Sequence, residues 1–231
     1  MSSRNLQAFT LSEALISIVV IGIIASLTLP AIITNFQQKS RLLSLNKAYN
    51  VLEQNLTSLQ TERYYKGSLT KSILSLANPK SNTVETSAGT FLKQYYKIAN
   101  DCGKATSEGC FASKYSTLSG SSADFTCKYG SREGYSVLLK DSSALCIIPA
   151  DMSGEYFTSA MVFVDVNGPK KPNIAGKDLF TFNIYNDFTI DEIEPKATRK
   201  PGMEQRCRTY TNPLAKSCFE SILLNNWKIV Y

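Results

Sequence analysis

The sequence predicts an α+β protein in which a long N-terminal α-helix packs on an antiparallel β-sheet. Three observations support this fold class. An uncharged, apolar run extends from Ala14 to Ile33, and apolar residues at helical spacing continue beyond it. Runs of β-branched and aromatic residues are concentrated in the second half of the chain. Since these runs do not alternate with helical segments, we expect antiparallel rather than parallel strands.

The apolar run is long enough to cross a membrane. At about 1.5 Å per residue, a helix from Ala14 to Ile33 spans about 30 Å, which is the thickness of the hydrocarbon core of a bilayer. The best candidate for a secretory cleavage site, around Ser26-Leu27-Thr28, is a poor match, so we expect the anchor to be retained. Residues 9–34 are therefore predicted to form a single transmembrane helix.

Glu13 lies at the edge of this segment and needs an explanation. Thr10 and Glu13 have the spacing of a capping box, in which both side chains bond to free amides at a helix start. Neutral side chains can also cap a helix, however, and a carboxylate at membrane depth costs about 2.5–3.5 kcal/mol or more. A nearby positive charge would offset this cost. Cutting the chain after Ala8 would create one, the α-amine of Phe9.

Residues 8–15, Ala-Phe-Thr-Leu-Ser-Glu-Ala-Leu, are followed by the apolar run with Pro30. This stretch resembles the N-terminus of type IV pilins and of the pseudopilins of type II secretion. The resemblance implies a pilin-like fold and a leader, residues 1–8, which a prepilin peptidase removes on the cytoplasmic side. The cut would fall between Ala8 and Phe9, and Phe9 would then be N-methylated. The family usually has Gly before the cut, where this chain has Ala8.

The same resemblance implies how the chain assembles. Glu13 would pair with the terminal amine of a neighbouring subunit, with Thr10 and Leu11 in the same assembly segment. Pro30 would kink the helix. Within lipid, the attraction between Glu13 and a cationic terminus is much stronger than in water, and it would set the axial stagger between subunits.

The resemblance implies a structural subunit of a type II secretion pseudopilus or a type IV pilus. Its partners would be itself or other pilins, the prepilin peptidase, an inner-membrane assembly platform and membrane lipid. It would be a single-pass protein of the bacterial inner membrane, with its head in the periplasm or in a filament at the cell surface. A minor pilin for adhesion or DNA uptake is the alternative, and a membrane-anchored extracytoplasmic enzyme is a third hypothesis from another class.

Composition bears on the enzyme and nucleic-acid hypotheses. The chain has no histidine, which excludes Ser-His-Asp and Cys-His catalysis and histidine metal ligands, so we expect no enzyme. The net charge of +6 is modest. Basic residues near the C-terminus are interrupted by acids, which favours a solvated surface over nucleic-acid binding. These basic residues are Lys196, Arg199, Lys200, Arg206 and Arg208.

The helical pattern continues past the apolar run. Apolar residues spaced three and four apart form one stripe, which predicts an amphipathic helix over residues 35–66. We expect the stripe to pack against the sheet of the chain itself, while a coiled-coil seam with a partner helix is the alternative. The stripe consists of Leu42, Leu45, Tyr49, Leu52, Leu56 and Leu59.

Residues 67–231 are predicted to form an extracytoplasmic α+β head. A short helix is expected around residues 72–77, and a second one over residues 90–98. Four runs have the composition of strands, namely Tyr135–Leu139, Ala144–Ile148, Met161–Val166 and Leu179–Tyr185.

Six cysteines lie in the second half of the chain, and none forms a C-x-x-C pair. Their even number downstream of an anchor indicates disulfides in an oxidising compartment, although buried free thiols are an alternative. Fifteen connectivities are open. We favour pairing of neighbours because short loops close most easily. The favoured pairs are Cys102–Cys110, Cys127–Cys146 and Cys207–Cys218.

Residues 162–187 resemble the strand-loop-strand near the C-terminus of many pseudopilins, where such loops can hold calcium. Asp165, Asn167 and Asp178 would supply the oxygen ligands that this ion prefers. The segment lacks the glutamate of an EF-hand, and Asp, Asn and Gly are also ordinary turn formers. The turn interpretation is favoured, and calcium binding is the alternative.

Overall fold

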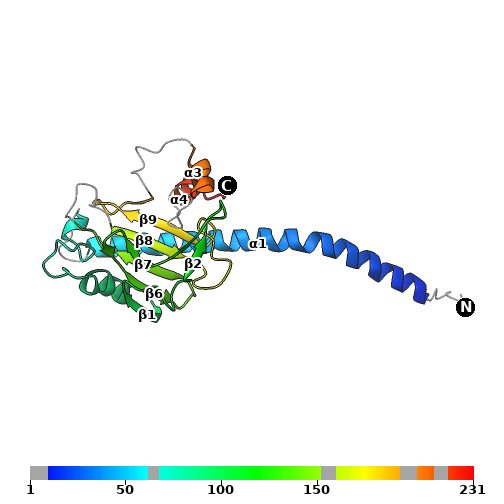
Figure 1. Ribbon diagram of the computed structural model, residues 1–231, viewed down its shortest axis with the longest axis horizontal. Helices are drawn as coiled ribbons and strands as arrows, with labels where there is room; N and C mark the ends of the chain where they lie inside the picture. Colours follow the sequence, from blue (N-terminus) through cyan, green and yellow to red (C-terminus); the bar gives the residue numbers. More distant parts are fainter. Residues whose placement is uncertain (1–9, 62–67, 152–159, 193–201, 211–217) are drawn as a thin grey trace, which may run out of the picture. The chain divides into compact units, whose positions relative to one another are not determined.

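The computed structural model describes residues 10–61, 68–151, 160–192, 202–210 and 218–231 (Figure 1). The chain forms two compact units, Met1–Ser40 and Arg41–Tyr231, which we call the N-terminal unit and the C-terminal unit. The structure confirms the α+β class, with one long apolar helix and an antiparallel sheet.

Helix α1, Leu11–Thr61, contains most of the helix predicted over residues 9–66. Its first part is apolar on all sides, and the large apolar side chains between Leu11 and Phe36 are 48–80% exposed. Residues 62–66 of the prediction lie outside the described residues. Unlike an amphipathic surface helix, this part of α1 presents no polar face.

The second part of α1 buries the predicted stripe. Leu45, Leu52, Leu56 and Leu59 are at most 2% exposed, while Leu42 and Tyr49 are partly buried against the same core. Figure 1 shows this part of the helix lying across one face of the sheet. The packing against the chain's own sheet is thus confirmed, and the stripe is not free to form a coiled-coil seam.

The main sheet has six strands in the order β1-β6-β7-β8-β9-β10, and each neighbouring pair is antiparallel. All four predicted strands are confirmed to within one residue. Strands β7 and β8 are buried throughout because α1 covers one face of the sheet and the cysteine-rich loops cover the other. These loops are the segment between β1 and β6, which contains Cys110 and Cys127. The bounds are β1 Ile98–Lys104, β6 Tyr135–Leu139, β7 Ala144–Ile148, β8 Ala160–Asp165, β9 Leu179–Ile184 and β10 Ile190–Asp191.

Shorter elements complete the C-terminal unit. Two hairpins lie in the region between β1 and β6, and two short helices lie near the C-terminus. These elements are η1 Leu69–Lys71, η2 Glu85–Gly89, α2 Thr90–Tyr95, β2 Lys114–Ser116, β3 Ser122–Asp124, β4 Lys128–Tyr129, β5 Arg132–Glu133, α3 Met203–Thr209 and α4 Cys218–Leu224.

The helix expected around residues 72–77 is wrong, because turns follow η1 there. The Ser72 hydroxyl bonds to the Leu69 carbonyl at 2.7 Å, and the Leu74 amide bonds to the Ser72 hydroxyl at 3.1 Å. Such local bonds compete with helix formation. The Ala150 amide also donates to the Leu74 carbonyl at 2.8 Å, which ties this segment to the end of β7.

The helix expected over residues 90–98 is correct only as far as Tyr95. Tyr96 has an extended backbone, and Ile98 pairs with Leu139 of β6 as the first residue of β1. Pairing with the sheet therefore overrides the helical pattern of the last three residues.

The three neighbour disulfides are confirmed, and no described cysteine is free. The interpretation as buried free thiols is therefore wrong. Cys127–Cys146 joins the cysteine-rich loops to the centre of β7, and Cys207–Cys218 joins α3 to α4. The Cys102–Cys110 and Cys127–Cys146 disulfides lie in the cluster that covers the face of the sheet opposite α1.

Polar contacts define the direction in which α1 crosses the sheet. Lys47 pairs with Asp141 in the turn between β6 and β7, at an Nζ–Oδ2 distance of 2.5 Å. Gln60 donates to the Asp187 carbonyl, beyond the other end of β9, at 3.4 Å. The start of the C-terminal unit, near Arg41, therefore lies at the same end of the sheet as the β6–β7 turn and the β8–β9 loop.

Candidate processing and assembly site

The start of α1 is built around the predicted capping box. The Thr10 amide and hydroxyl both donate to Glu13 Oε2, at 2.9 and 2.7 Å, and the Glu13 amide donates to Thr10 Oγ1 at 3.3 Å. These bonds satisfy donors that a helix start otherwise leaves free. The capping interpretation of Glu13 is therefore confirmed, and it accounts for only one of the two carboxylate oxygens.

Glu13 is exposed, as is Leu11 beside it at 80%. Ala8 and Phe9 lie outside the described residues, so cleavage and methylation stay predictions. The structure thus shows a carboxylate at the first turn of an apolar helix, with an oxygen directed to no described donor. A cation from a second molecule could approach it without breaking the capping box.

The hydroxyl groups inside the apolar segment are satisfied by the helix itself. Each of them donates to a backbone carbonyl three or four residues earlier, as lipid requires because it offers no hydrogen-bond partners. The four donors are Ser17, Ser26, Thr28 and Thr34, with donor–acceptor distances of 2.8–3.0 Å. These four hydroxyl groups therefore need no hydrogen-bond partner from a bilayer.

Pro30 lies within α1, and the helix continues on both sides of it. Proline cannot donate the usual backbone hydrogen bond and so weakens a helix locally. A kink at this position stays a prediction. Within the described residues, α1 is the helix that is long and apolar enough to cross a membrane, which makes it a candidate single span.

The predicted calcium ligands lie at the two ends of the β8–β9 loop. Asp165 is fully buried; its Oδ2 accepts a short hydrogen bond from the Tyr115 hydroxyl, and its Oδ1 accepts one from the Asn167 amide at 3.0 Å. Burial raises the pKa of Asp165 to about 7. Both oxygens of this carboxylate are thus bound within the protein, in the manner of a turn.

Asp178 is also fully buried, and it forms an ion pair with Arg41. Arg41 Nε lies 2.9 Å from Asp178 Oδ1, and the Ile174 amide donates to Asp178 Oδ2 at 3.0 Å. Burial raises the pKa of Asp178, while the charge of Arg41 acts in the opposite direction. The guanidinium therefore occupies the place beside this carboxylate that a metal ion would need.

This donor set does not fit a calcium ion, which takes six to eight oxygens. Of the loop side chains, the Oδ1 atoms of Asn167 and Asn173 are buried without a described hydrogen-bond donor. No group of three or more acidic or cysteine side chains suited to a metal was found among the described residues. The arrangement favours the turn interpretation, and calcium binding is left to experiment.

We expect the thermal unfolding midpoint of the protein to be the same in millimolar calcium and in excess chelator. The reason is that Arg41 and the loop amides already compensate both carboxylates. Differential scanning calorimetry of the detergent-solubilised chain measures this directly, with magnesium as a control for ionic strength. A midpoint that rises with calcium alone would contradict the turn interpretation.

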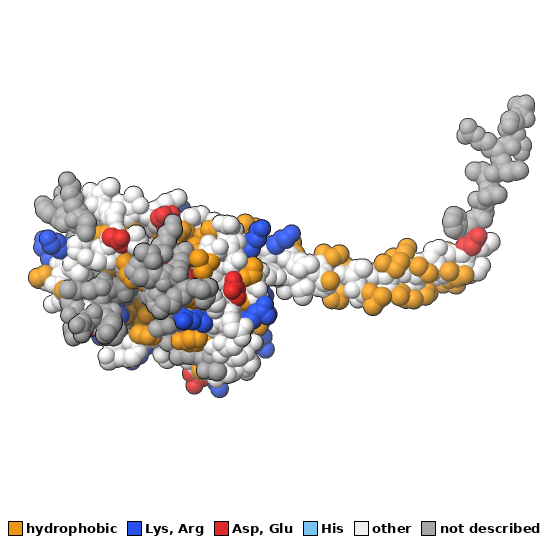
Figure 2. Space-filling model, turned by 90° about the horizontal axis from the view of Figure 1, so that it is seen from above, with side chains coloured by type: hydrophobic (Ala, Val, Ile, Leu, Met, Phe, Trp, Pro, Cys, Tyr) orange, Lys and Arg blue, Asp and Glu red, His pale blue; other side chains and the backbone are white. Residues whose placement is uncertain are grey.

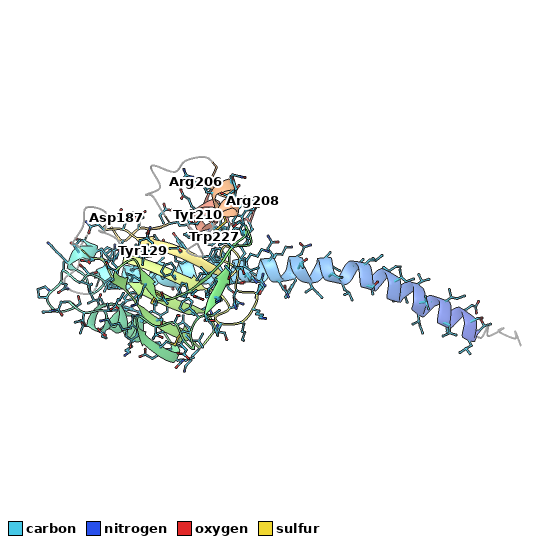
Figure 3. The ribbon with its side chains drawn as sticks, in the orientation of Figure 1. Tyr129, Asp187, Arg206, Arg208, Tyr210 and Trp227 are labelled. Atoms are coloured by element: carbon cyan, nitrogen blue, oxygen red, sulfur yellow. A yellow bond between two sulfur atoms is a disulfide. The ribbon has the colours of Figure 1, made fainter. Side chains whose placement is uncertain are left out.

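Two of the five C-terminal basic residues lie within the described residues. Arg206 and Arg208 lie on α3 (Figure 3), and Arg208 donates to the Val230 carbonyl at 3.1 Å. Lys196, Arg199 and Lys200 lie outside the described residues. Whether this region contacts nucleic acid stays an untested prediction.

Sequence reasoning missed two residues at the β8–β9 loop. Neither Arg41 nor Tyr115 was singled out from the sequence. Both form their bonds with residues far away in the chain, so no local spacing could have indicated them. Acidic residues at the ends of apolar strands were the sign in the sequence that such partners are needed.

A comparison of the chain with protein-family models finds no match. Comparisons with curated proteins and with solved structures find none either. The function of the chain is therefore inferred from the residues and geometry described above.

Proposed function

We propose that the protein is a pilin-like structural subunit that assembles into a pseudopilus or a type IV pilus through its N-terminal helix. The leader is removed after Ala8, and the freed and methylated amine of Phe9 pairs with Glu13 of a neighbouring subunit. The C-terminal unit remains outside the membrane.

The observation that carries this proposal is the combination at the start of α1. An exposed carboxylate lies in the first turn of a helix, and the large apolar side chains that follow it are exposed within the described part of the chain. In a soluble monomer, an apolar surface of this size would be a liability. In a bilayer it is solvated by lipid, and in a filament it is buried by other copies of the same helix.

The capping box is compatible with this role. One Glu13 oxygen holds the helix start, so the carboxylate is oriented before a partner arrives. A cationic terminus then adds an ion pair in a medium of low dielectric constant, where charge attraction is strong. Because apolar helices have little hydrophobic reason to associate within lipid, such a polar contact selects the neighbour and its stagger.

The test is assembly in a cell that provides a prepilin peptidase, an assembly platform and its ATPase. The chain should be found in the filament fraction that is sheared from the cells, and its abundance there should depend on the ATPase. A chain that inserts into the membrane but never enters sheared filaments would contradict the proposal.

A further inference from the structure

The loop between β8 and β9, residues 166–178, carries a concentrated positive charge, and we call it the lysine loop. Lys170, Lys171 and Lys177 are exposed. The loop contains no acidic residue before Asp178, which is fully buried against Arg41. Its exposed surface is therefore basic without local compensation.

The lysine loop is held rigidly by several parts of the C-terminal unit. The Ser116 amide donates to the Asn173 carbonyl at 3.0 Å, and the Ala175 amide donates to the Ser116 carbonyl at 2.8 Å. The Tyr231 hydroxyl donates to the Gly176 carbonyl at 2.7 Å. A side chain at position 176 would come within 2.8 Å of a sulfur atom of the Cys207–Cys218 disulfide.

Gly176 also has a positive φ of 87°, which glycine adopts without strain. The loop therefore has a defined shape and keeps its lysines in one place. An ordinary flexible loop would lose this arrangement and would have to be ordered again on each encounter with a partner.

Chain connectivity limits how far the end of the lysine loop can lie from a bilayer that residues 9–34 would span. Arg41, which binds the end of this loop at Asp178, follows Ile33 by eight residues in α1. At about 1.5 Å per residue, this is about 12 Å beyond the apolar segment. That rise is comparable to the thickness of the headgroup layer plus a Debye length of about 8–10 Å, so lysines near Arg41 would experience the charge of the lipid surface if α1 spans a bilayer.

The neighbouring β6–β7 turn adds to the same charge. Gly168 of the lysine loop lies against Ser142 of this turn, where an added Cβ would come within 2.7 Å of the Ser142 carbonyl. Lys140 in the turn is exposed, and Asp141 is paired with Lys47. Figure 2 shows Lys and Arg side chains, with acidic side chains among them, on the visible face of the C-terminal unit.

We propose that the lysine loop binds anionic phospholipid headgroups at the outer surface of the membrane in which α1 is anchored. The proposal rests on the proposed function, because it needs α1 to span a bilayer. Exposed lysines act as point charges without directional geometry, which suits a fluid surface of phosphates better than one fixed acidic partner. The contact would orient the C-terminal unit on the membrane before the subunit enters a filament.

Lysine acetylation in vesicles tests this proposal with the full chain. The protein is reconstituted into vesicles of phosphatidylcholine alone, or of phosphatidylcholine with about one third phosphatidylglycerol, and treated briefly with uncharged acetic anhydride. Mass spectrometry then gives the acetylation rate of each lysine. We expect Lys170, Lys171 and Lys177 to react about fivefold more slowly in the anionic vesicles, given roughly 1 kcal/mol for each lysine near such a surface. High salt should remove the difference.

Lys71 and Lys80 are internal controls. Both are exposed, and Leu69 beside Lys71 bonds to Asn186 at the other end of the sheet. Their rates should change little between the two kinds of vesicle. Equal slowing of all these lysines, or no slowing of any, would overturn the proposal. Protection that appears only when other filament proteins are added would also overturn it, in favour of an acidic protein partner.

A matched pair of variants isolates the lysine loop. In Lys170→Gln/Lys171→Gln, the protection of Lys177 should fall, whereas Lys71→Gln/Lys80→Gln should leave it unchanged. Flotation of the chain with carbonate-washed vesicles separates the two hypotheses. A chain that does not float contradicts the membrane anchor and hence the proposed function, whereas a chain that floats without lysine protection contradicts only the lipid contact.

Discussion

Glu13→Ala is expected to leave the protein folded but to remove it from filaments. Among the described residues, the carboxylate has Thr10 in the same helix turn as its hydrogen-bond partner. Its loss should therefore leave the thermal unfolding midpoint of the C-terminal unit unchanged. Incorporation into sheared filaments should fall below detection, because no other acidic side chain lies in the apolar segment to attract a cationic terminus.

Glu13→Gln separates the capping role from the charge. Glutamine can still complete a capping box, but it is neutral. If the ion pair is what assembles the filament, this variant should also fail to assemble. Glu53→Ala, which removes an exposed carboxylate from the same helix, should assemble normally. Normal assembly of Glu13→Gln would show that Glu13 serves only as a cap.

Leu52→Ala is expected to destabilise the C-terminal unit and to leave membrane insertion unchanged, whereas Glu13→Ala should leave the stability of the C-terminal unit unchanged. Leu52 is 2% exposed and lies in the core between α1 and the sheet. Removing a buried leucine side chain costs about 2–5 kcal/mol, because apolar contacts are lost and a cavity remains. Denaturant unfolding followed by circular dichroism should show a loss of this size.

Leu43→Ala is the matched control for this change. Leu43 lies on the same helix but is 71% exposed, so its truncation should change the free energy of unfolding by less than about 0.5 kcal/mol. Similar losses in the two variants would contradict the assignment of the buried stripe. Leu52→Ala should still insert into membranes, because the apolar segment is unchanged.

The periodic parts of the fold could be predicted from the sequence. The stripe from Leu42 to Leu59 and the four apolar strands repeat a pattern that burial imposes on each element. Strand β1 was missed because it is an edge strand, Ile98–Lys104, with polar and small residues that are mostly exposed. Its position depends on pairing with β6 and on the Cys102–Cys110 disulfide, and neither is a local property.

In the candidate site, too, the local contacts could be predicted from the sequence and the non-local contacts could not. The contact between Thr10 and Glu13 is local, so their spacing was enough to predict it. The partners of Asp165 and Asp178 come from other elements, so their spacing suggested a metal site where the structure has Tyr115 and Arg41. A carboxylate next to a strand indicates that some partner is needed, but the fold decides whether a cation or a hydroxyl group meets it.

The intact mass of the mature protein tests the central claim most directly. The chain is expressed together with a prepilin peptidase, purified from membranes and measured with its disulfides intact, with Ala8→Gly as a control for cleavage efficiency. We expect a chain that has lost residues 1–8 and carries one added methyl group on Phe9. If Met1 is still attached while Ala8→Gly is cleaved, the nitrogen of Phe9 remains in a peptide bond and cannot pair with Glu13 as a cation, and the assembly mechanism proposed for this protein is contradicted.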